Sequence, residues 1–125
     1  MANVETALKD AMTTIEGAIG AALVDYGSGM ALGTVGGGKD LDLGVAAAGN
    51  TDVVRAKVRT MDLLGLNDEI EDILITLGTQ YHLIRLMKGR GANGHFFLYL
   101  ALDRGRANLA MARHQLKRIE GELEI

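Results

Sequence analysis

Apolar residues along the chain change their spacing from segment to segment, and the spacing predicts the secondary structure. Near the N-terminus they recur at helical intervals through residues 4–15, and Asn3 stands where an N-cap belongs. Residues 18–26 and 30–35 read as two strands joined by the turn sequence Gly27-Ser28-Gly29, which is typical of a β-hairpin. The chain is therefore expected to begin with a helix followed by a hairpin.

The longest expected helix covers residues 39–64, with Asp40 as its N-cap and Gly65 just past its C-terminus. Its main face is apolar and comprises Leu43, Ala46, Ala47, Val54, Val58, Met61 and Leu64. A polar row on the opposite face comprises Asp52, Arg55, Arg59 and Asp62, and a second apolar ridge comprises Val45, Ala56 and Leu63. Asn50 and Lys57 interrupt the main face, and a helix with one simple apolar side does not explain them.

The rest of the chain predicts three strands and a last helix. The strands are expected at residues 70–77, 80–87 and 95–103, with an open glycine loop at 88–94. The run FFLYLAL in the last strand is apolar at every position, so this strand is expected to lie centrally and to be covered on both faces.

These elements predict a single α+β domain over residues 1–125, in the order α-β-β-α-β-β-β-α. Short connections favour hairpins over parallel crossovers, which gives a five-stranded antiparallel sheet between helical layers. The N-terminal helix is expected within residues 1–16, and the C-terminal helix within 105–123.

The segment DILITL, the third expected strand, would lie at an edge of this sheet. It is apolar, β-branched and free of Lys and Pro, so it lacks the usual protection of an exposed edge. We expect the same strand of a second copy to cover it, in an antiparallel homodimer. The residues expected at this dimer edge are Ile73, Leu74, Ile75, Thr76 and Leu77. The ridge formed by Val45, Ala56 and Leu63 is expected to contribute a helix contact to the same dimer.

The composition of the chain argues against several classes of function. The 125 residues carry a formal charge of −3, which argues against general nucleic-acid binding. Cysteine is absent, so disulfides, thiolate metal sites and a cysteine nucleophile are excluded. The N-terminus shows no basic and apolar leader, and no apolar run approaches the ~18 residues that span a bilayer. We expect a cytoplasmic protein without membrane insertion.

No group of residues predicts catalysis. The sequence GTVGGGKD at residues 33–40 resembles a phosphate-binding P-loop, but Asp40 replaces the hydroxyl residue that such a loop needs for magnesium. Ser28, the only serine, lacks a nucleophile-elbow sequence. The three histidines (His82, His95 and His114) lack chelating spacing, and the acidic cluster Asp68, Glu69, Glu71 and Asp72 lacks calcium-loop geometry. We expect no nucleotide site, no metal, no cofactor and no enzymatic activity.

Several segments together resemble the roadblock/LC7 family. They are the hairpin ALVDYGSGMALGTV, the small-residue-rich helix LDLGVAAAGNTDVVRAKVRTMDLLG, and ITLGTQYHLIRLM followed by HFFLYLAL. The resemblance implies a profilin-like fold with strand order 2-1-5-4-3 and homodimers that pair their third strands and place their long helices side by side. It also implies non-catalytic regulators or scaffolds of small Ras-like GTPases. The triple glycine and the KGRGANG loop depart from the family pattern.

Two functions remain open from the sequence. The first is a dimeric interaction module for a small Ras-like GTPase, with Asp52, Arg55, Arg59 and Asp62 as its contact surface. An ordinary solvated helix face explains that row equally well. The second is a ligand-sensing module, because related profilin-like folds hold small molecules between sheet and helices; Asn50 and Lys57 would be its candidate polar groups.

Overall fold

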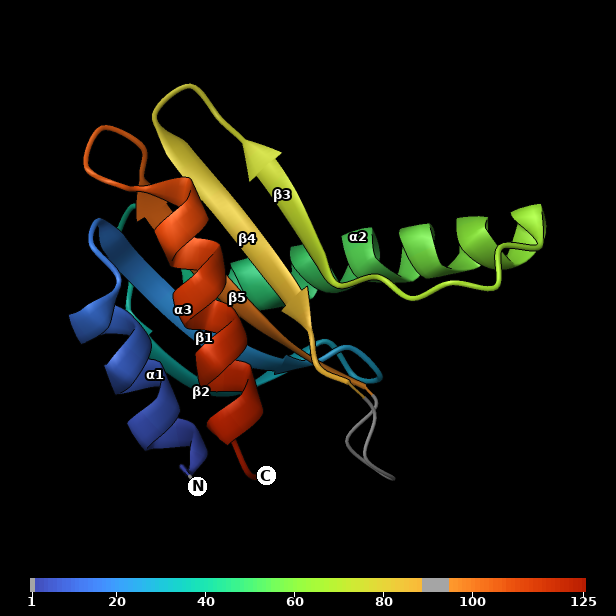
Figure 1. Ribbon diagram of the computed structural model, residues 1–125, viewed down its shortest axis with the longest axis horizontal. Coiled ribbons are helices and arrows are strands. Elements are labelled where there is room, and N and C mark those ends of the chain that lie inside the picture. Colours follow the sequence, from blue (N-terminus) through green and yellow to red (C-terminus); the bar gives the residue numbers. More distant parts are fainter. Residues whose placement is uncertain (1, 89–94) are drawn as a thin grey trace.

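One antiparallel sheet with the strand order β2-β1-β5-β4-β3 organises the computed structural model, which describes residues 2–88 and 95–125. The elements of this part of the chain are α1 (Val4–Thr14), β1 (Ala18–Asp25), β2 (Met30–Gly36), α2 (Leu43–Leu64), β3 (Asp72–Thr76), β4 (Gln80–Leu86), β5 (Phe96–Asp103) and α3 (Leu109–Glu122). Their order and the sheet topology confirm the predicted fold class (Figure 1). The expected glycine loop falls largely on residues 89–94, outside the described residues.

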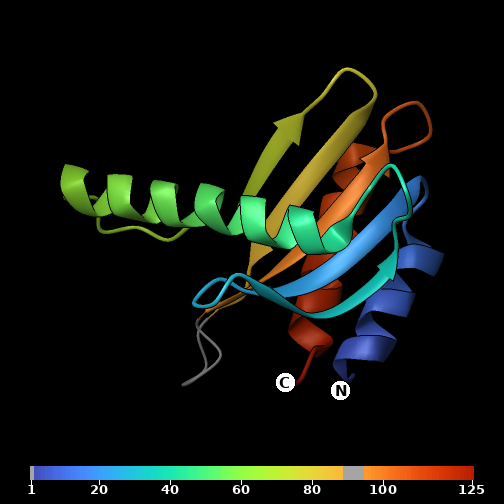
Figure 2. The ribbon, with the colours of Figure 1, turned by 180° about the vertical axis from the view of Figure 1, so that it is seen from behind.

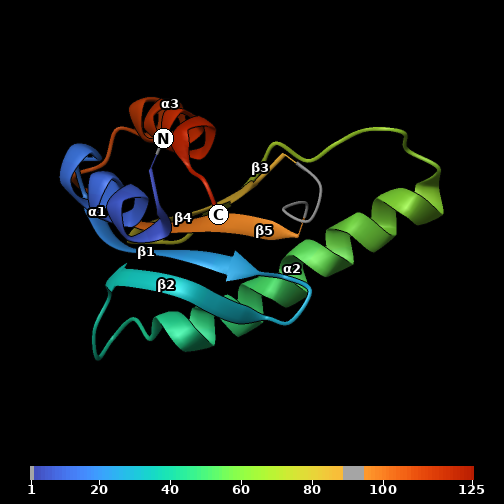
Figure 3. The ribbon, with the colours of Figure 1, turned by 90° about the horizontal axis from the view of Figure 1, so that it is seen from below.

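The sheet separates two hydrophobic cores. Helices α1 and α3 lie together on one face, and α2 lies alone on the other (Figure 3). The central strand β5 serves both cores, since Leu98 and Leu100 pack under α1 and α3 while Phe97 and Tyr99 pack on the α2 side. Coverage on both faces is why this strand lacks the usual alternation of apolar and polar residues.

Side-chain caps set the helix boundaries, and one of them differs from the sequence prediction. Asn3 caps α1 as predicted, accepting a hydrogen bond from the Thr6 amide at 2.8 Å. Helix α2 begins at Leu43, however, because its N-cap is Asp42 and not Asp40. The Asp42 carboxylate accepts hydrogen bonds from the amides of Gly44 and Val45. Both aspartates suit the role, and only the tertiary path of the loop selects between them.

The terminal helices are shorter than predicted. Helix α1 ends at Thr14, and α3 begins at Leu109 where the sequence suggested residue 105. Asp103 explains the later start, because its carboxylate and carbonyl accept hydrogen bonds from the amides of Gly105 and Ala107 in a tight turn. Asn108 then caps α3.

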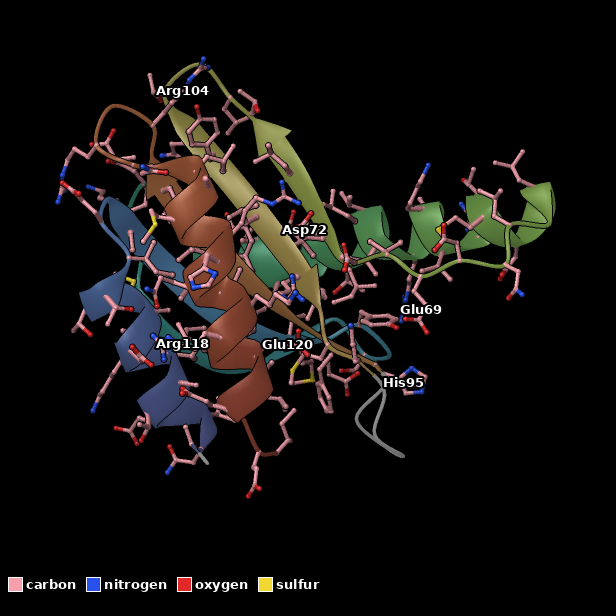
Figure 4. All side chains as sticks on the ribbon, in the orientation of Figure 1. Glu69, Asp72, His95, Arg104, Arg118 and Glu120 are labelled. Carbon is pink, nitrogen blue, oxygen red and sulfur yellow. The ribbon has the colours of Figure 1, made fainter. Side chains whose placement is uncertain are left out.

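Two arginines tie α3 to neighbouring elements. Arg113 forms a bidentate ion pair with Asp72 of β3, at 2.9 and 3.0 Å. Arg118 bonds both carboxylate oxygens of Asp10 in α1, at 3.1 and 3.2 Å, and it lowers the pKa of that carboxyl (Figure 4). These contacts link α3 to β3 on one side and to α1 on the other.

Helix α2 extends well beyond the sheet that it covers. Its 22 residues span about 33 Å at 1.5 Å per residue. The buried residues Leu43, Ala47, Thr51 and Val54 all belong to its first twelve positions. Its C-terminal half projects past the β3 edge (Figures 1 and 2), where Leu63 is 81% exposed. Among the described residues, none of the helices has the length and apolarity to cross a bilayer.

Candidate functional site

The outer edge of β3 carries unpaired backbone groups. Strand β3 pairs only with β4, in a register that places Ile75 opposite His82 and Thr76 opposite Tyr81. The Leu77 amide donates to the Gln80 carbonyl at 2.8 Å and so marks a hydrogen-bonded pair. Because such pairs alternate along an antiparallel ladder, the N–H and C=O groups of Leu74 and Thr76 point away from β4. The edge therefore presents a regular row of donors and acceptors.

The side chains of the predicted dimer edge lie on both faces of this strand. Ile73 and Ile75 are half-buried against the α2-side core. Leu74 is 38% exposed on the opposite face, and Leu77, just past the strand, is 41% exposed. None of the predicted edge residues carries charge, so among the described residues the strand lacks the lysine or proline that usually protects an edge.

The outer face of α2 carries the predicted apolar ridge. At 100° per residue, Val45, Ala56 and Leu63 lie roughly opposite the buried residues of this helix. All three are exposed, and Val45 is 68% exposed. Near β4, Val45 also lines an open groove, together with Ala46, Gly49 and Asn50. A contact between the ridge and a second copy stays a prediction.

The predicted polar row of α2 divides into two parts. The Arg55 side chain binds the hairpin turn: its Nε and a terminal nitrogen donate to the carbonyls of Tyr26 and Gly27 at 2.8 and 2.6 Å. It therefore holds the β1–β2 turn against α2. Asp52, Arg59 and Asp62 are exposed, and their side chains make no hydrogen bond or ion pair within the described residues. These three side chains are available to a partner.

A hydrogen-bonded chain explains the position of Asn50. The Asn50 side chain bonds the Tyr99 hydroxyl, which lies 3.2 Å from His82 Nδ1. His82 Nε2 lies 2.8 Å from the Gln80 side-chain oxygen. A neutral His82 with its proton on Nε2 satisfies every contact, by accepting from Tyr99 and donating to Gln80. Burial raises the pKa of Tyr99 to about 12 and lowers the pKa of His82 from its ordinary value of 6.5.

Protonation of His82 should destabilise the fold. Since the folded protein holds the lower pKa, the unfolded chain binds this proton first as the pH falls. The stability that neutral His82 contributes is complete above pH 6.5. It is lost as the pH falls from 6.5 through the lower pKa that His82 has in the folded protein. We expect the urea unfolding midpoint to drop as the pH is lowered from neutral into the acid range, and His82→Gln to reduce that drop. The exposed His114, replaced in the same way, is the control; equal pH dependence in both variants would contradict the prediction.

The glycine-rich loop is closed by its own hydrogen bonds. Gly36, Gly37 and Gly38 all have positive φ angles (76°, 76° and 151°), which explains the triple glycine. The amides of Gly37 and Gly38 donate to the carbonyls of Ile19 and Leu41, so they are not free to hold phosphate. The first amides of α2 are already occupied by Asp42. This geometry supports the expectation that the loop binds no nucleotide.

The other residues that the sequence offered as candidates for a chemical site take part in contacts within the fold. His95 packs edge-on against Tyr26 at 5.8 Å between ring centroids. Ser28 accepts a hydrogen bond from the Met30 amide inside its turn. In the acidic cluster, Asp72 is held by Arg113. Within residues 2–88 and 95–125, no three His, Cys, Asp or Glu side chains are placed to hold a metal ion.

Comparison with solved structures identifies the architecture. A roadblock/LC7 domain from Streptomyces avermitilis superimposes with a TM-score of 0.79 over 97% of this chain and 94% of that one, at 11% identity. The fold is that of the roadblock/LC7 domain. Structures of MglB with this fold also match. Myxococcus xanthus MglB has a TM-score of 0.73 and 19% identity, over 93% of this chain and 84% of that one. The gliding protein MglB of Thermus thermophilus has a TM-score of 0.69 and 21% identity, over 95% and 89%.

The likeness to roadblock/LC7 structures is one of fold. No family model matches the sequence, and no curated protein matches it. At 11–21% identity these comparisons carry the fold alone, so the function has to be argued from the β3 edge and α2 of this chain.

Proposed function

We propose that the protein is a non-catalytic homodimeric regulator or scaffold for a small Ras-like GTPase, acting through protein–protein contact. The observation that carries the proposal is the exposure of the β3 edge and the overhanging half of α2 at one side of the molecule (Figures 1 and 3). The roadblock/LC7 family, which the sequence resembles, includes regulators of this class of GTPase.

The proposed dimer pairs β3 with β3 of a second copy, antiparallel, to make one continuous sheet. The unpaired backbone groups of Leu74 and Thr76 would then form the central hydrogen bonds. The overhanging half of each α2 would lie over the partner's sheet, where it could cover the half-buried Ile73 and Ile75. The exposed ridge of Val45, Ala56 and Leu63 would supply the contact between the two long helices. A specific dimer should bury about 1,200 Å² or more.

The proposed GTPase surface is the polar row of α2, doubled by the dimer symmetry. Asp52, Arg59 and Asp62 supply its free charges. A GTPase is a single asymmetric body, so one GTPase per dimer is expected, placed across the two-fold axis.

Charge reversal on this row should abolish partner binding. We expect Arg59→Glu combined with Asp62→Lys to weaken binding at least ~100-fold, because charges at an interface govern association and arginines are enriched at binding hot spots. Folding and dimerisation should be unchanged, because both side chains are exposed and make no hydrogen bond or ion pair within the described residues. Arg55 is left intact because it holds the hairpin turn.

The measurement is calorimetric titration with the GTPase that copurifies with the wild-type protein from its own cell extract. The matched control exchanges the exposed pair Glu5 and Lys9 on α1, a charge swap on the opposite side of the sheet. Wild-type affinity in the Arg59/Asp62 variant would disprove the proposed surface. Failure to recover any GTPase would disprove the proposed partner class.

Between the sheet and α2, the alternative ligand-sensing function receives no specific support. It depended on Asn50 and Lys57 as unexplained polar groups. The hydrogen bond to Tyr99 accounts for Asn50, and Lys57 is exposed to solvent. For the α2 side of the molecule we therefore retain the GTPase proposal.

A further inference from the structure

A single arginine interrupts the apolar core sequence of β4. Arg85 points to the α3 side of the sheet, opposite to its neighbour Ile84, and it is only 5% exposed. Its Nε donates to a carboxylate oxygen of Glu120 in α3 at 2.7 Å, and the Glu120 side chain is itself 12% exposed. Figure 4 places Glu120 near the C-terminal end of α3, beside β4. The pair is therefore held in a largely desolvated position.

The guanidinium of Arg85 is only partly satisfied by this contact. A guanidinium carries five N–H donors, and Glu120 takes one of them. The two terminal nitrogens have no acceptor among residues 2–88 and 95–125, although the side chain is more than nine-tenths buried. They are not sealed in the core, since no fully buried side-chain nitrogen there lacks a partner. Arg85 instead lines a cavity of about 240 Å³.

The cavity has a marked excess of positive charge. Lys88, directly after β4, and Lys117 of α3 line it together with Arg85, and Glu120 is the only acidic residue among the described residues of its lining. Three cations less one carboxylate leave a charge of +2. Glu120 balances Arg85, so the two lysines are the uncompensated charges. A dianion would neutralise the site.

The remaining walls leave room for a small group. They are formed by Met87, Gly121 and Leu123. A water molecule takes about 30 Å³ of liquid volume, so the cavity can hold a tetrahedral anion of about five heavy atoms with some water. The C-terminal end of α3 lies here and offers carbonyl oxygens in place of amides, so side chains must supply the donors.

We propose that this cavity, formed by Arg85, Lys88 and Lys117, binds a phosphate dianion, either free or as the terminal group of a small phosphomonoester. The two terminal nitrogens of the Arg85 guanidinium form a planar fork that can donate to two oxygens of a tetrahedral anion. Each lysine adds a point charge. The site lies on the α3 side of the sheet, away from α2, so it does not depend on the proposed GTPase surface.

The test is an NMR titration of backbone amides near the cavity, at mildly alkaline pH and constant ionic strength. The two probes are inorganic phosphate and glycerol 3-phosphate, whose relative affinities distinguish a free ion from an ester. We expect saturable shifts at Lys88 and Gly121, competed by sulfate and not by chloride. Lys88→Gln with Lys117→Gln should weaken binding at least tenfold; both residues are exposed, so the fold should be retained.

Matched controls separate this site from general electrostatic attraction. Lys9→Gln with Lys57→Gln removes the same two charges from other exposed positions and should leave the affinity unchanged. Arg85→Lys keeps the charge but removes the fork, and it should also weaken binding. Shifts that rise linearly without saturation, or equal affinity in the two double-lysine variants, would overturn the proposal.

Discussion

Replacing Thr76 by proline is expected to convert the proposed dimer into a monomer at micromolar concentration. The Thr76 amide points away from β4, so proline removes no hydrogen bond within the sheet, and proline is tolerated at such an edge position. In the dimer, each copy loses the hydrogen bond that its Thr76 amide would donate to the partner strand. Two buried carbonyls, one in each copy, are then left unpaired. At about 1–3 kcal/mol for each carbonyl, the dissociation constant should rise at least ~30-fold.

Light scattering coupled to gel filtration measures this change as a fall from about twice 13.3 kDa to 13.3 kDa. Thr76→Ala is the matched control, because it removes the side chain but keeps the amide, and it should remain dimeric. Ile75→Lys also places charge at this edge and should weaken the dimer. This variant is a less specific test of the dimer, because the Ile75 side chain also packs against the α2-side core and its replacement affects the stability of the fold. A wild-type protein that is monomeric at micromolar concentration would refute the dimer itself.

Removing the carboxylate of Glu120 should cause a large loss of stability. In Glu120→Ala the buried Arg85 would keep its charge without a counter-ion. Removing one member of a buried ion pair costs about 3–5 kcal/mol, because the remaining charge stays desolvated and unpaired. For a domain of this size, we expect the melting temperature to fall by roughly 10–20 °C.

Thermal unfolding followed by circular dichroism measures the effect. Glu5→Ala is the control, since Glu5 pairs with Lys9 at the surface and its loss should produce no measurable change. Replacing both Arg85 and Glu120 by methionine should restore most of the stability, because no unpaired charge remains. If Glu120→Ala melts like Glu5→Ala, Arg85 is hydrated through the cavity and the buried-pair interpretation fails.

The elements of this fold followed largely from local patterns. The two-face apolar run of β5 predicted a central strand because a strand covered on both sides needs no polar positions. Gly27-Ser28-Gly29 predicted the hairpin turn, and Gly65 marked the end of α2 with a φ of 70°. These signals depend on backbone conformations and burial patterns that neighbouring residues specify by themselves.

The contacts that define the surfaces depended on partners distant in sequence. Arg55 belongs by its spacing to an exposed row, but its guanidinium binds the hairpin turn 28 and 29 residues earlier. Arg85 gave one visible signal, a charge inside an apolar strand. Its partner Glu120 lies 35 residues away and is placed by the docking of α3. Sequence periodicity shows which face of an element a residue occupies, but not which group that face meets.

By itself, the sequence determined the order of the elements, the central position of β5, and the absence of cysteine chemistry. Only the tertiary structure decided that Asp42 caps α2, that Asn50 bonds Tyr99, and that the last turns of α2 extend beyond the sheet. The physical reason is the distance along the chain over which each effect acts. Helix and turn propensities act over a few residues, whereas the burial of a polar group depends on which surfaces the folded chain brings together.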